Sequence, residues 1–278
     1  CPRPANVVVD ATTITTNSAD ISWVDSIATT WVVEYGPSGF VRGTGTTNIA
    51  YSTQYTLQGL DHSTNYDVYV TAVCSASDTS YSSFVTSFAT ACGTIDNFPF
   101  YEDFLGYQTG SSTSIPHFPL CWNGSSNYSS TYPYIQSGTG IDGTTTEYEY
   151  MYCYAATTDL GTKYTYLALP AIDSTMYQMS DLMVSFVTKA GTISSSYDAR
   201  LYVGVATDPN NLATYVAIDT IERTTTDWLT ISELELSSYT GNGKYIVFWV
   251  CPQTASYSTF YIDDIEVDVI PTCYRPQD

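Results

Sequence analysis

Short runs of alternating hydrophobic and polar residues recur along the chain, and polar turns separate them. In residues 18–23, Ala19, Ile21 and Trp23 alternate with polar positions. Successive side chains of a strand point to opposite faces, so this pattern predicts strands with one buried face. Over residues 1–92 it predicts seven short strands, at 5–10, 18–23, 31–37, 40–42, 51–57, 66–73 and 83–90. Such a series is typical of an immunoglobulin-like sandwich.

Beyond Cys92 the alternating runs become longer. Segments 106–118 and 123–145 are rich in Ser, Thr, Gly and Asn and predict long loops. Asn242-Gly243 lies between two predicted strands and predicts a hairpin turn. The predicted strands are 98–104, 148–155, 164–169, 182–188, 200–206, 215–221, 228–236, 244–251 and 259–269. Long antiparallel strands of this kind favour a jelly-roll sandwich over residues 93–272.

The composition agrees with an all-β fold and excludes several functions. Tyr occurs 26 times, whereas Lys and Arg together occur only 8 times. The net charge of −20 excludes nucleic acid, whose phosphates need basic side chains, and anionic membrane surfaces. It is compatible with cation binding, and its simpler consequence is solubility. No run of eighteen apolar residues is present, so we expect no direct membrane insertion.

The cysteines indicate disulfide bonds in an exported protein. The chain has seven cysteines but only two histidines and no Cys-x-x-Cys pair, which argues against a zinc site. Buried free thiols are the alternative. The candidates for disulfides are Cys1, Cys74, Cys92, Cys121, Cys153 and Cys251, and their pairing cannot be fixed from spacing alone.

The first residues of the chain recur near its end. Cys1-Pro2-Arg3-Pro4 is echoed by Cys273-Tyr274-Arg275-Pro276. The repeat predicts a tandem array in which residues 273–278 begin the next module and Cys273 has lost its partner. An alternative is that Cys1 is the lipidated first residue of a processed bacterial lipoprotein.

The first ninety residues resemble a fibronectin type III domain. The resemblance is carried by Ser22-Trp23, by Leu57-x-x-Leu60 and by Thr64-x-Tyr66 with the alternating residues that follow. It implies that Tyr66 forms the tyrosine corner, whose hydroxyl group is bonded to the backbone. It also implies that Cys1 and the end of the sixth strand lie at one pole, where Cys1 can reach Cys74. We expect Trp31 to be a packing residue.

An ordered set of segments in the second domain resembles the MAM-like and cleaved-adhesin jelly rolls of bacterial surface proteins. The segments are 99–104, 119–122, 167–172, 201–205, 208–210, 243–248 and 260–267. The resemblance implies a sandwich with galactose-binding-like topology. Such domains alternate with fibronectin type III modules in surface adhesins, which is the order found here.

The same resemblance implies a structural calcium ion near the first and last strands. The candidate ligands are Glu102, Asp103, Asp263 and Asp264. Calcium prefers six to eight oxygen ligands, and carboxylates on adjacent strands can supply several. Leu105 stands where the family often has another acidic residue. The alternative is that one Asp of each pair caps a turn or faces solvent.

No catalytic motif is apparent, so we expect the chain not to be an enzyme. His62 and His117 lie in different predicted domains, and no nucleophile-elbow, zincin or P-loop pattern occurs. A glycosidase needs only two carboxylates, and Glu147 and Glu149 come nearest to forming a pair.

These observations predict a non-catalytic segment of an exported bacterial cell-surface adhesin, located outside the cell. Its partners would be neighbouring modules and a host or cell-surface glycan or protein. The alternative is a carbohydrate-binding module, because exposed aromatic rings stack on sugar rings. The candidate ligand residues are Tyr128, Tyr132, Tyr134, Trp228 and Tyr257. A purely structural spacer is a third possibility.

Overall fold

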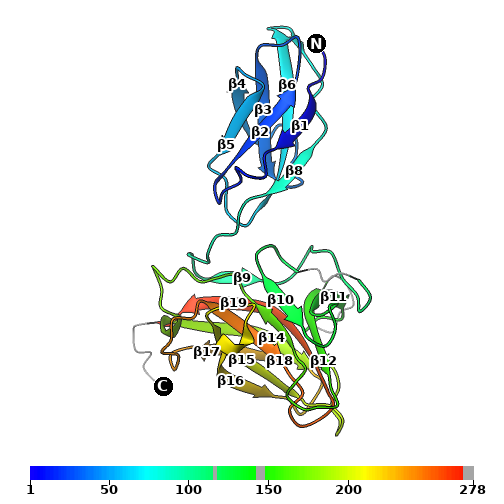
Figure 1. Ribbon diagram of the computed structural model, residues 1–278, viewed down its shortest axis with the longest axis vertical. Helices are drawn as coiled ribbons and strands as arrows, with labels where there is room; N and C mark the ends of the chain where they lie inside the picture. The colour runs from blue at the N-terminus through cyan, green and yellow to red at the C-terminus, as the bar shows by residue number, and fades with distance from the viewer. Residues whose placement is uncertain (115–117, 142–147, 272–278) are drawn as a thin grey trace. The chain divides into compact units, whose positions relative to one another are not determined.

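The computed structural model describes residues 1–114, 118–141 and 148–271, and its strands form two compact units (Figure 1). The units are Cys1–Gly93 and Thr94–Asp278, so the division lies one residue beyond the predicted boundary. The regular elements of the described residues are β-strands, apart from the short 3-10 helices η1 (Met179–Asp181) and η2 (Leu212–Thr214). The all-β prediction is confirmed. The predicted module start at 273–278 lies outside the described residues.

The first unit is a sandwich of two antiparallel sheets. One sheet has the order β1-β2-β5, with bounds Ala5–Val9, Ser18–Val24 and Gln54–Gln58. The other has the order β4-β3-β6-β7, and β8 also pairs with β6. The bounds of β3, β4, β6, β7 and β8 are Trp31–Pro37, Thr46–Ala50, Asn65–Ser75, Asp78–Thr79 and Thr86–Ala89.

The predicted core of this unit is confirmed. Trp23 and Trp31 are both buried and meet edge to face, with 5.6 Å between ring centroids. The indole Nε1 of Trp31 donates to Asp25 Oδ2 over 3.0 Å, so Trp31 is a packing residue with a satisfied polar atom. The hydroxyl oxygen of Tyr66 accepts a hydrogen bond from the backbone N–H of Asp61 at 2.9 Å. Tyr66 is therefore the tyrosine corner.

A disulfide joins Cys1 to Cys74, as predicted, with 5.6 Å between their Cα atoms. The terminal ammonium group of Cys1 lies 3.3 Å from Asp78 Oδ2 in the adjacent strand β7. The disulfide fixes the start of the chain to the end of β6.

The strand predicted at 40–42 is wrong, because this segment is a turn. Gly39 and Gly43 flank it with φ of 82° and 91°, in the left-handed region that favours glycine. Between them, Arg42 donates from Nε to Glu34 Oε2 at 2.7 Å and lies over the ring of Tyr69. The strand at this edge of the sheet is instead β4, which pairs with β3 and whose sequence TTNIA lacks clear alternation.

The second unit is also a sandwich of two antiparallel sheets. The five-stranded sheet has the order β10-β13-β18-β15-β16, with bounds Asn123–Ser126, Thr165–Ala168, Tyr245–Val250, Arg200–Ala206 and Val216–Glu222. The six-stranded sheet has the order β11-β12-β19-β14-β17, with bounds Tyr134–Gly138, Tyr148–Ala156, Tyr257–Val269, Leu182–Ala190 and Leu229–Glu235. Its sixth strand, β9 (Phe100–Glu102), pairs with β19. This arrangement is compatible with a jelly roll.

The inner faces of these sheets form one hydrophobic core. Phe186 of β14 and Phe248 of β18 meet across it, with ring centroids 4.9 Å apart. In β12, Met151 and Cys153 point into this core. Because successive side chains of a strand point to opposite faces, Tyr150, Tyr152 and Tyr154 point to the other face of the six-stranded sheet.

Two predictions about loops in this unit are wrong. Segment 123–145 contains the strands β10 and β11. β10 is not predicted from the sequence because its four residues, NGSS, are polar or lack a side chain. Asn242-Gly243 does not close a hairpin, because the strands it separates, β17 and β18, belong to different sheets. Gly243 is needed for close packing, since a Cβ atom there would lie 2.5 Å from the hydroxyl oxygen of Tyr239.

Cys153 and Cys251 are both free and buried, so their place among the disulfide candidates is wrong. Cys153 belongs to the core between the sheets. Val250 belongs to the same core, so the next residue, Cys251, points away from it, and its Sγ accepts a hydrogen bond from Gln253 Nε2. The alternative of buried free thiols therefore holds for this pair. Cys92 and Cys121 are each disulfide-bonded.

Candidate functional site

The six-stranded sheet carries a row of aromatic side chains on the face directed away from the core. The strand register places Tyr134 opposite Tyr152, and Tyr152 opposite Tyr261. Lys189 follows opposite Tyr261 on β14. Trp228, immediately before β17, lies beside Lys189. These five residues are called the aromatic row.

The rings of this face touch one another continuously. Centroids lie 5.2 Å apart for Tyr134 and Tyr152, and 5.0 Å apart for Tyr152 and Tyr261. Tyr150 approaches Tyr261 edge to face at 5.1 Å. Tilted and edge-to-face pairs at such distances are favourable because the positive ring edge meets the negative face. The row is therefore a preorganised surface.

Lys189 lies among three rings of this surface. Its Nζ is 4.5 Å from the centroid of Trp228, 4.9 Å from that of Tyr261 and 5.6 Å from that of Tyr150. The negative ring faces attract the ammonium group. Burial lowers the pKa of Lys189, because the charged form loses part of its hydration.

The structure brings four of the five predicted ligand residues to this face. Tyr132 stacks on Tyr134 at 5.5 Å, and Tyr128 approaches Tyr132 at 6.3 Å. Tyr132 and Tyr134 are largely covered, whereas Tyr128 is 41% exposed. Trp228 lies at the other end of the row. Tyr257 lies apart, at the start of β19, against Tyr197.

Sequence reasoning missed the centre of this face. Tyr148, Tyr150, Tyr152 and Tyr154 occupy every second position of β12. Side chains two residues apart in a strand lie on one face, so this spacing alone indicates an aromatic stripe. Tyr261 and Lys189 follow only from the pairing of β12, β19 and β14, which the sequence does not reveal.

The four predicted metal ligands lie on β19, on β9 and directly after β9. Glu102 pairs with Ile265 across these two strands. Asp263 is only 2% exposed, and its pKa is raised to about 8. Burial is the largest cause and the negative charges of Asp264, Asp103 and Glu102 add to it, while the hydrogen bond from the backbone of Asp264 acts in the opposite direction. The four carboxylates are therefore electrostatically coupled.

A β-bulge places the two aspartates side by side. Ile262 and Ile265 both point into the core although they are three residues apart, and the pairing of β14 with β19 shifts at this point. Asp264 has a φ of 47°, in the left-handed region. A bulge inserts one residue and re-aims the neighbouring side chains. The spacing Ile262-x-x-Ile265 within an otherwise alternating strand is the sequence signal for it.

Each of the other carboxylates accepts a hydrogen bond. Glu102 accepts from the backbone N–H of Phe104 at 2.7 Å and from the Tyr107 hydroxyl at 3.2 Å. Asp103 accepts from the N–H of Leu105 at 3.0 Å, and Asp264 accepts from the Tyr101 hydroxyl. These oxygens are held in place by the backbone and by tyrosines, and no basic side chain among the described residues pairs with them.

The donor chemistry fits calcium, because all four groups are carboxylates and one of them is buried next to like charges. As they stand, the four do not bring three ligand atoms within 4.8 Å of one another. In the described part of the chain, Cys1, Cys74 and Asp78 form the one group that meets this distance, and its two sulfur atoms are bonded to each other. A bound ion would therefore draw the carboxylates together.

One of the four carboxylates, Asp263, adjoins the aromatic row. It lies two residues after Tyr261 on β19, so the two side chains share the outer face of the six-stranded sheet. Glu102 lies opposite Ile265, which points into the core, and is therefore not part of that outer face.

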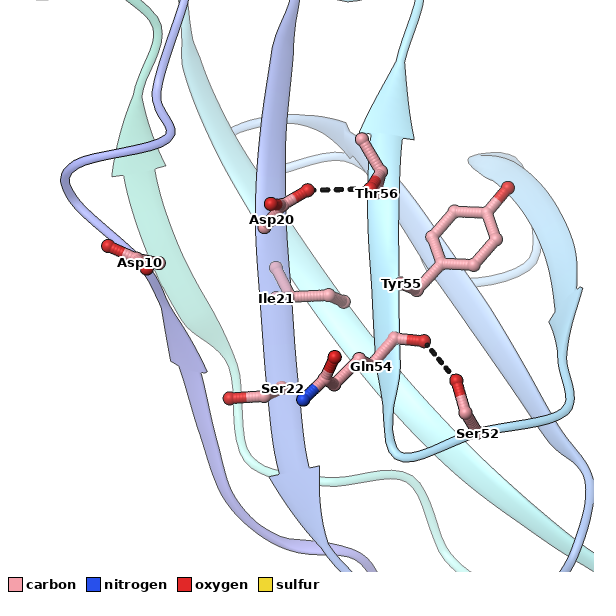
Figure 2. A pocket seen from close by; sticks show the side chains of 8 residues that line it. All are labelled: Asp10, Asp20, Ile21, Ser22, Ser52, Gln54, Tyr55 and Thr56. Carbon is pink, nitrogen blue, oxygen red and sulfur yellow. Dashed lines mark hydrogen bonds between the residues drawn. The ribbon is translucent and has the colours of Figure 1, made fainter.

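Three hollows in the described part of the chain hold none of the predicted site residues. A polar groove of about 490 Å³ lies in the first unit along β2 and β5. Figure 2 shows the side chains that line it. In it, the Thr56 hydroxyl donates to Asp20 Oδ1 at 2.6 Å and the Ser52 hydroxyl donates to the carbonyl of Gln54 at 3.0 Å. Two pairs of its polar groups thus already bond to one another.

The candidate catalytic residues do not form a site within the part of the chain that is described. His62 contacts the hydroxyl group of its neighbour Ser63 at 3.0 Å. Glu149 accepts a hydrogen bond from the backbone N–H of Gly106. His117 and Glu147 lie outside the described residues.

Comparison with known proteins identifies the first unit. The family model of the fibronectin type III domain matches residues 2–88, so this unit is a fibronectin type III domain. Such domains are generally non-catalytic modules, and those with disulfides are typical of extracellular proteins. A search of curated proteins found no match. Among the described residues, no helix is long and apolar enough to cross a membrane.

Solved structures also resemble part of the chain. A chain described as "Myokine structure" is 22% identical, covers 32% of this chain over 97% of its own length and gives a TM-score of 0.27. A computer-based redesign of a β-sandwich protein is 26% identical, with coverages of 32% and 95% and a TM-score of 0.28. The FN5 domain of Drosophila Lar is 17% identical, with coverages of 33% and 98% and a TM-score of 0.29.

Proposed function

We propose that the chain is a non-catalytic segment of a bacterial cell-surface adhesin, exported from the cell and active outside it. The observation that carries this proposal is a disulfide-bonded fibronectin type III domain followed by a second β-sandwich with an aromatic outer face. In this proposal the first domain positions the second, and the second contacts the partner. Neighbouring modules of the parent chain would continue the array.

Surface labelling tests the adhesin proposal. An antibody raised against residues 1–278 should label intact cells that express the parent protein. Beads coated with the chain should adhere to the target surface, and soluble chain should compete with them. Labelling that requires permeabilised cells, or coated beads that adhere no better than albumin-coated beads, would contradict the proposal.

We infer a second, more specific function, the binding of a glycan by the aromatic row. Tyr152, Tyr261 and Trp228 of the row are partly exposed, and sugar rings stack on exposed ring faces while polar groups bond their hydroxyls. Binding of the purified chain to a glycan array tests this function. If protein that is verified to be folded binds no glycan on the array, glycan binding is contradicted. The adhesin proposal would then require a protein partner.

We also propose that Glu102, Asp103, Asp263 and Asp264 hold a structural calcium ion. The ion would supply positive charge to a buried carboxylate that otherwise has only negative neighbours. Because the site adjoins the aromatic row, the ion would stabilise the strand that carries Tyr261. A calcium titration of thermal stability tests this proposal, as set out in the Discussion.

A further inference from the structure

Lys189 is a cation held in place on the aromatic face without an anionic partner. Among the described residues, no carboxylate forms an ion pair with its ammonium group. Arg42 and Arg200 pair with Glu34 and Asp198, whereas the other basic side chains of the described residues, Lys189 among them, form no ion pair. Lys189 is distinguished by its place, because its ammonium group lies over three aromatic rings.

The three rings hold the ammonium group but leave its hydrogens without strong acceptors. Ring faces stabilise a cation electrostatically, whereas each N–H of an ammonium group prefers an oxygen lone pair. Lys189 is half-buried, and burial lowers its pKa, so part of its water shell is already lost. An oxygen anion on a ligand would pair with this ammonium group at a reduced cost of desolvation.

The position of Lys189 suits a sugar that lies on the row. The lysine is between Tyr261 and Trp228 along the row, with its Nζ within 5 Å of both ring centroids. A pyranose ring that stacks on one of these aromatic rings would bring its substituents beside the ammonium group. A carboxylate substituent would form a charge-assisted hydrogen bond, which is shorter and stronger than a bond to a neutral hydroxyl.

We propose that the aromatic row selects an acidic saccharide, with Lys189 as the residue that pairs with the carboxylate of a uronic-acid-type sugar. This inference rests on the proposed glycan binding and adds the chemical class of the ligand. Trp228 and Tyr261 provide the stacking surface, and Lys189 determines the preference for the acidic form. The site thus combines shape recognition by rings with charge recognition by one lysine.

The negative net charge of the chain opposes the approach of an anionic sugar, but only over a short range. At physiological ionic strength the Debye length is about 8 Å, so distant carboxylates are screened. Lys189, whose Nζ lies within 5 Å of the ring centroids of Trp228 and Tyr261, acts on a stacked sugar at contact range, so its effect on the preference is measurable by substitution.

Matched ligands and variants test the inference. Isothermal titration calorimetry would compare uronic-acid tetrasaccharides with the same molecules after reduction of the carboxyl groups to alcohols. The variants are Lys189→Met, which keeps the apolar stem and removes the charge, and Lys189→Arg, which keeps the charge. Lys244→Met is the matched control, because Lys244 stacks on a single ring, Tyr245, which belongs to the other sheet. Near-ultraviolet circular dichroism confirms that each variant is folded.

We expect the wild-type chain to bind the acidic form about tenfold more tightly than the reduced form, as for a hydrogen bond to a charged group. Lys189→Met should abolish this preference, whereas Lys189→Arg and Lys244→Met should retain it. Equal binding of both forms, or a preference unchanged in Lys189→Met, would overturn the inference while glycan binding stands. Failure of both forms to bind would overturn the inference and the glycan-binding function together.

Discussion

At the scale of single residues, buried charges in this chain are held by several hydrogen bonds at once. Asp198 is almost fully buried, and it accepts from Arg200 Nε at 2.8 Å and from Arg200 Nη2 at 2.7 Å. It also accepts from the backbone N–H groups of Gln253 and Thr254 at 2.6 and 2.9 Å. Asp198 thereby connects the start of β15 to the segment after β18.

We predict that Asp198→Asn lowers the free energy of unfolding by about 3 kcal/mol, as expected when one member of a buried ion pair is removed. Asn retains one acceptor oxygen but cannot form the paired contact with Arg200. Urea unfolding followed by fluorescence measures the change. Asp96→Asn is the control, because Asp96 is exposed. A loss below about 0.5 kcal/mol would show that the network does not stabilise the fold.

The same carboxylate predicts how stability depends on pH. Burial raises the pKa of Asp198, but the hydrogen bonds from Arg200, Gln253 and Thr254 outweigh it and hold the pKa below the usual 3.8. The folded state therefore binds its proton less readily than the unfolded state. The stabilisation is present above about pH 4 and disappears as the pH falls through the folded-state pKa. Between pH 5 and pH 2, the wild-type chain should lose more stability than Asp198→Asn, as measured by thermal unfolding.

At the scale of strands, the sequence predicts elements well where one face is buried and the other is polar. β2, β3 and β15 follow the predicted ranges closely because their apolar residues alternate. β4, β10 and β11 were missed because pairing with a neighbouring strand, rather than their own apolar residues, keeps them extended.

The candidate site shows the same limit. The pairs Glu102-Asp103 and Asp263-Asp264 are visible in the sequence itself. The electrostatic coupling between the two pairs depends on the bulge at Asp264 and on the pairing of β9 with β19. The aromatic row depends on the register of four strands. The sequence alone therefore could not predict that residues as far apart as Tyr134 and Lys189 lie in one row.

We predict that removal of the disulfide between Cys1 and Cys74 destabilises the first domain. The bond closes most of this domain, with a sequence separation of 73 residues. Loss of such a constraint on the unfolded chain costs roughly 2–5 kcal/mol. The double variant Cys1→Ser, Cys74→Ser should unfold at lower urea concentration than the wild-type chain. Cys251→Ser is the comparison, because Cys251 is a free thiol. Equal midpoints for the double variant and the wild type would contradict the prediction.

At the scale of the whole molecule, we expect calcium to stabilise the second sandwich. A ligand that binds only the folded state raises stability by mass action, by about 2.7 kcal/mol at a hundredfold excess over its Kd. Thermal unfolding should therefore shift upward in millimolar calcium and return in excess chelator.

Asp263→Asn separates a specific site from a general effect of salt. This variant removes the buried charge but can still accept the hydrogen bond from the backbone of Asp264. Without calcium it should be more stable than the wild type, and calcium should not stabilise it further. An equal calcium shift in both proteins would contradict the proposed ligand set.

We propose a binding segment whose first domain is a fibronectin type III module and whose recognition surface is the aromatic row. Trp228 and Tyr202 offer a matched comparison. Both are half-buried aromatic residues of the second sandwich, but Tyr202 lies on the other sheet, against Trp249.

The most direct test is glycan-array binding by the wild-type chain, Trp228→Ala and Tyr202→Ala, each verified to be folded. We predict that the wild type and Tyr202→Ala bind the same glycans, and that Trp228→Ala loses roughly 5- to 150-fold in affinity, if a sugar stacks on the indole about as strongly as a nucleic-acid base does, on the order of 1–3 kcal/mol. Unchanged binding by Trp228→Ala, or a loss confined to Tyr202→Ala, would show that the aromatic row is not the recognition surface.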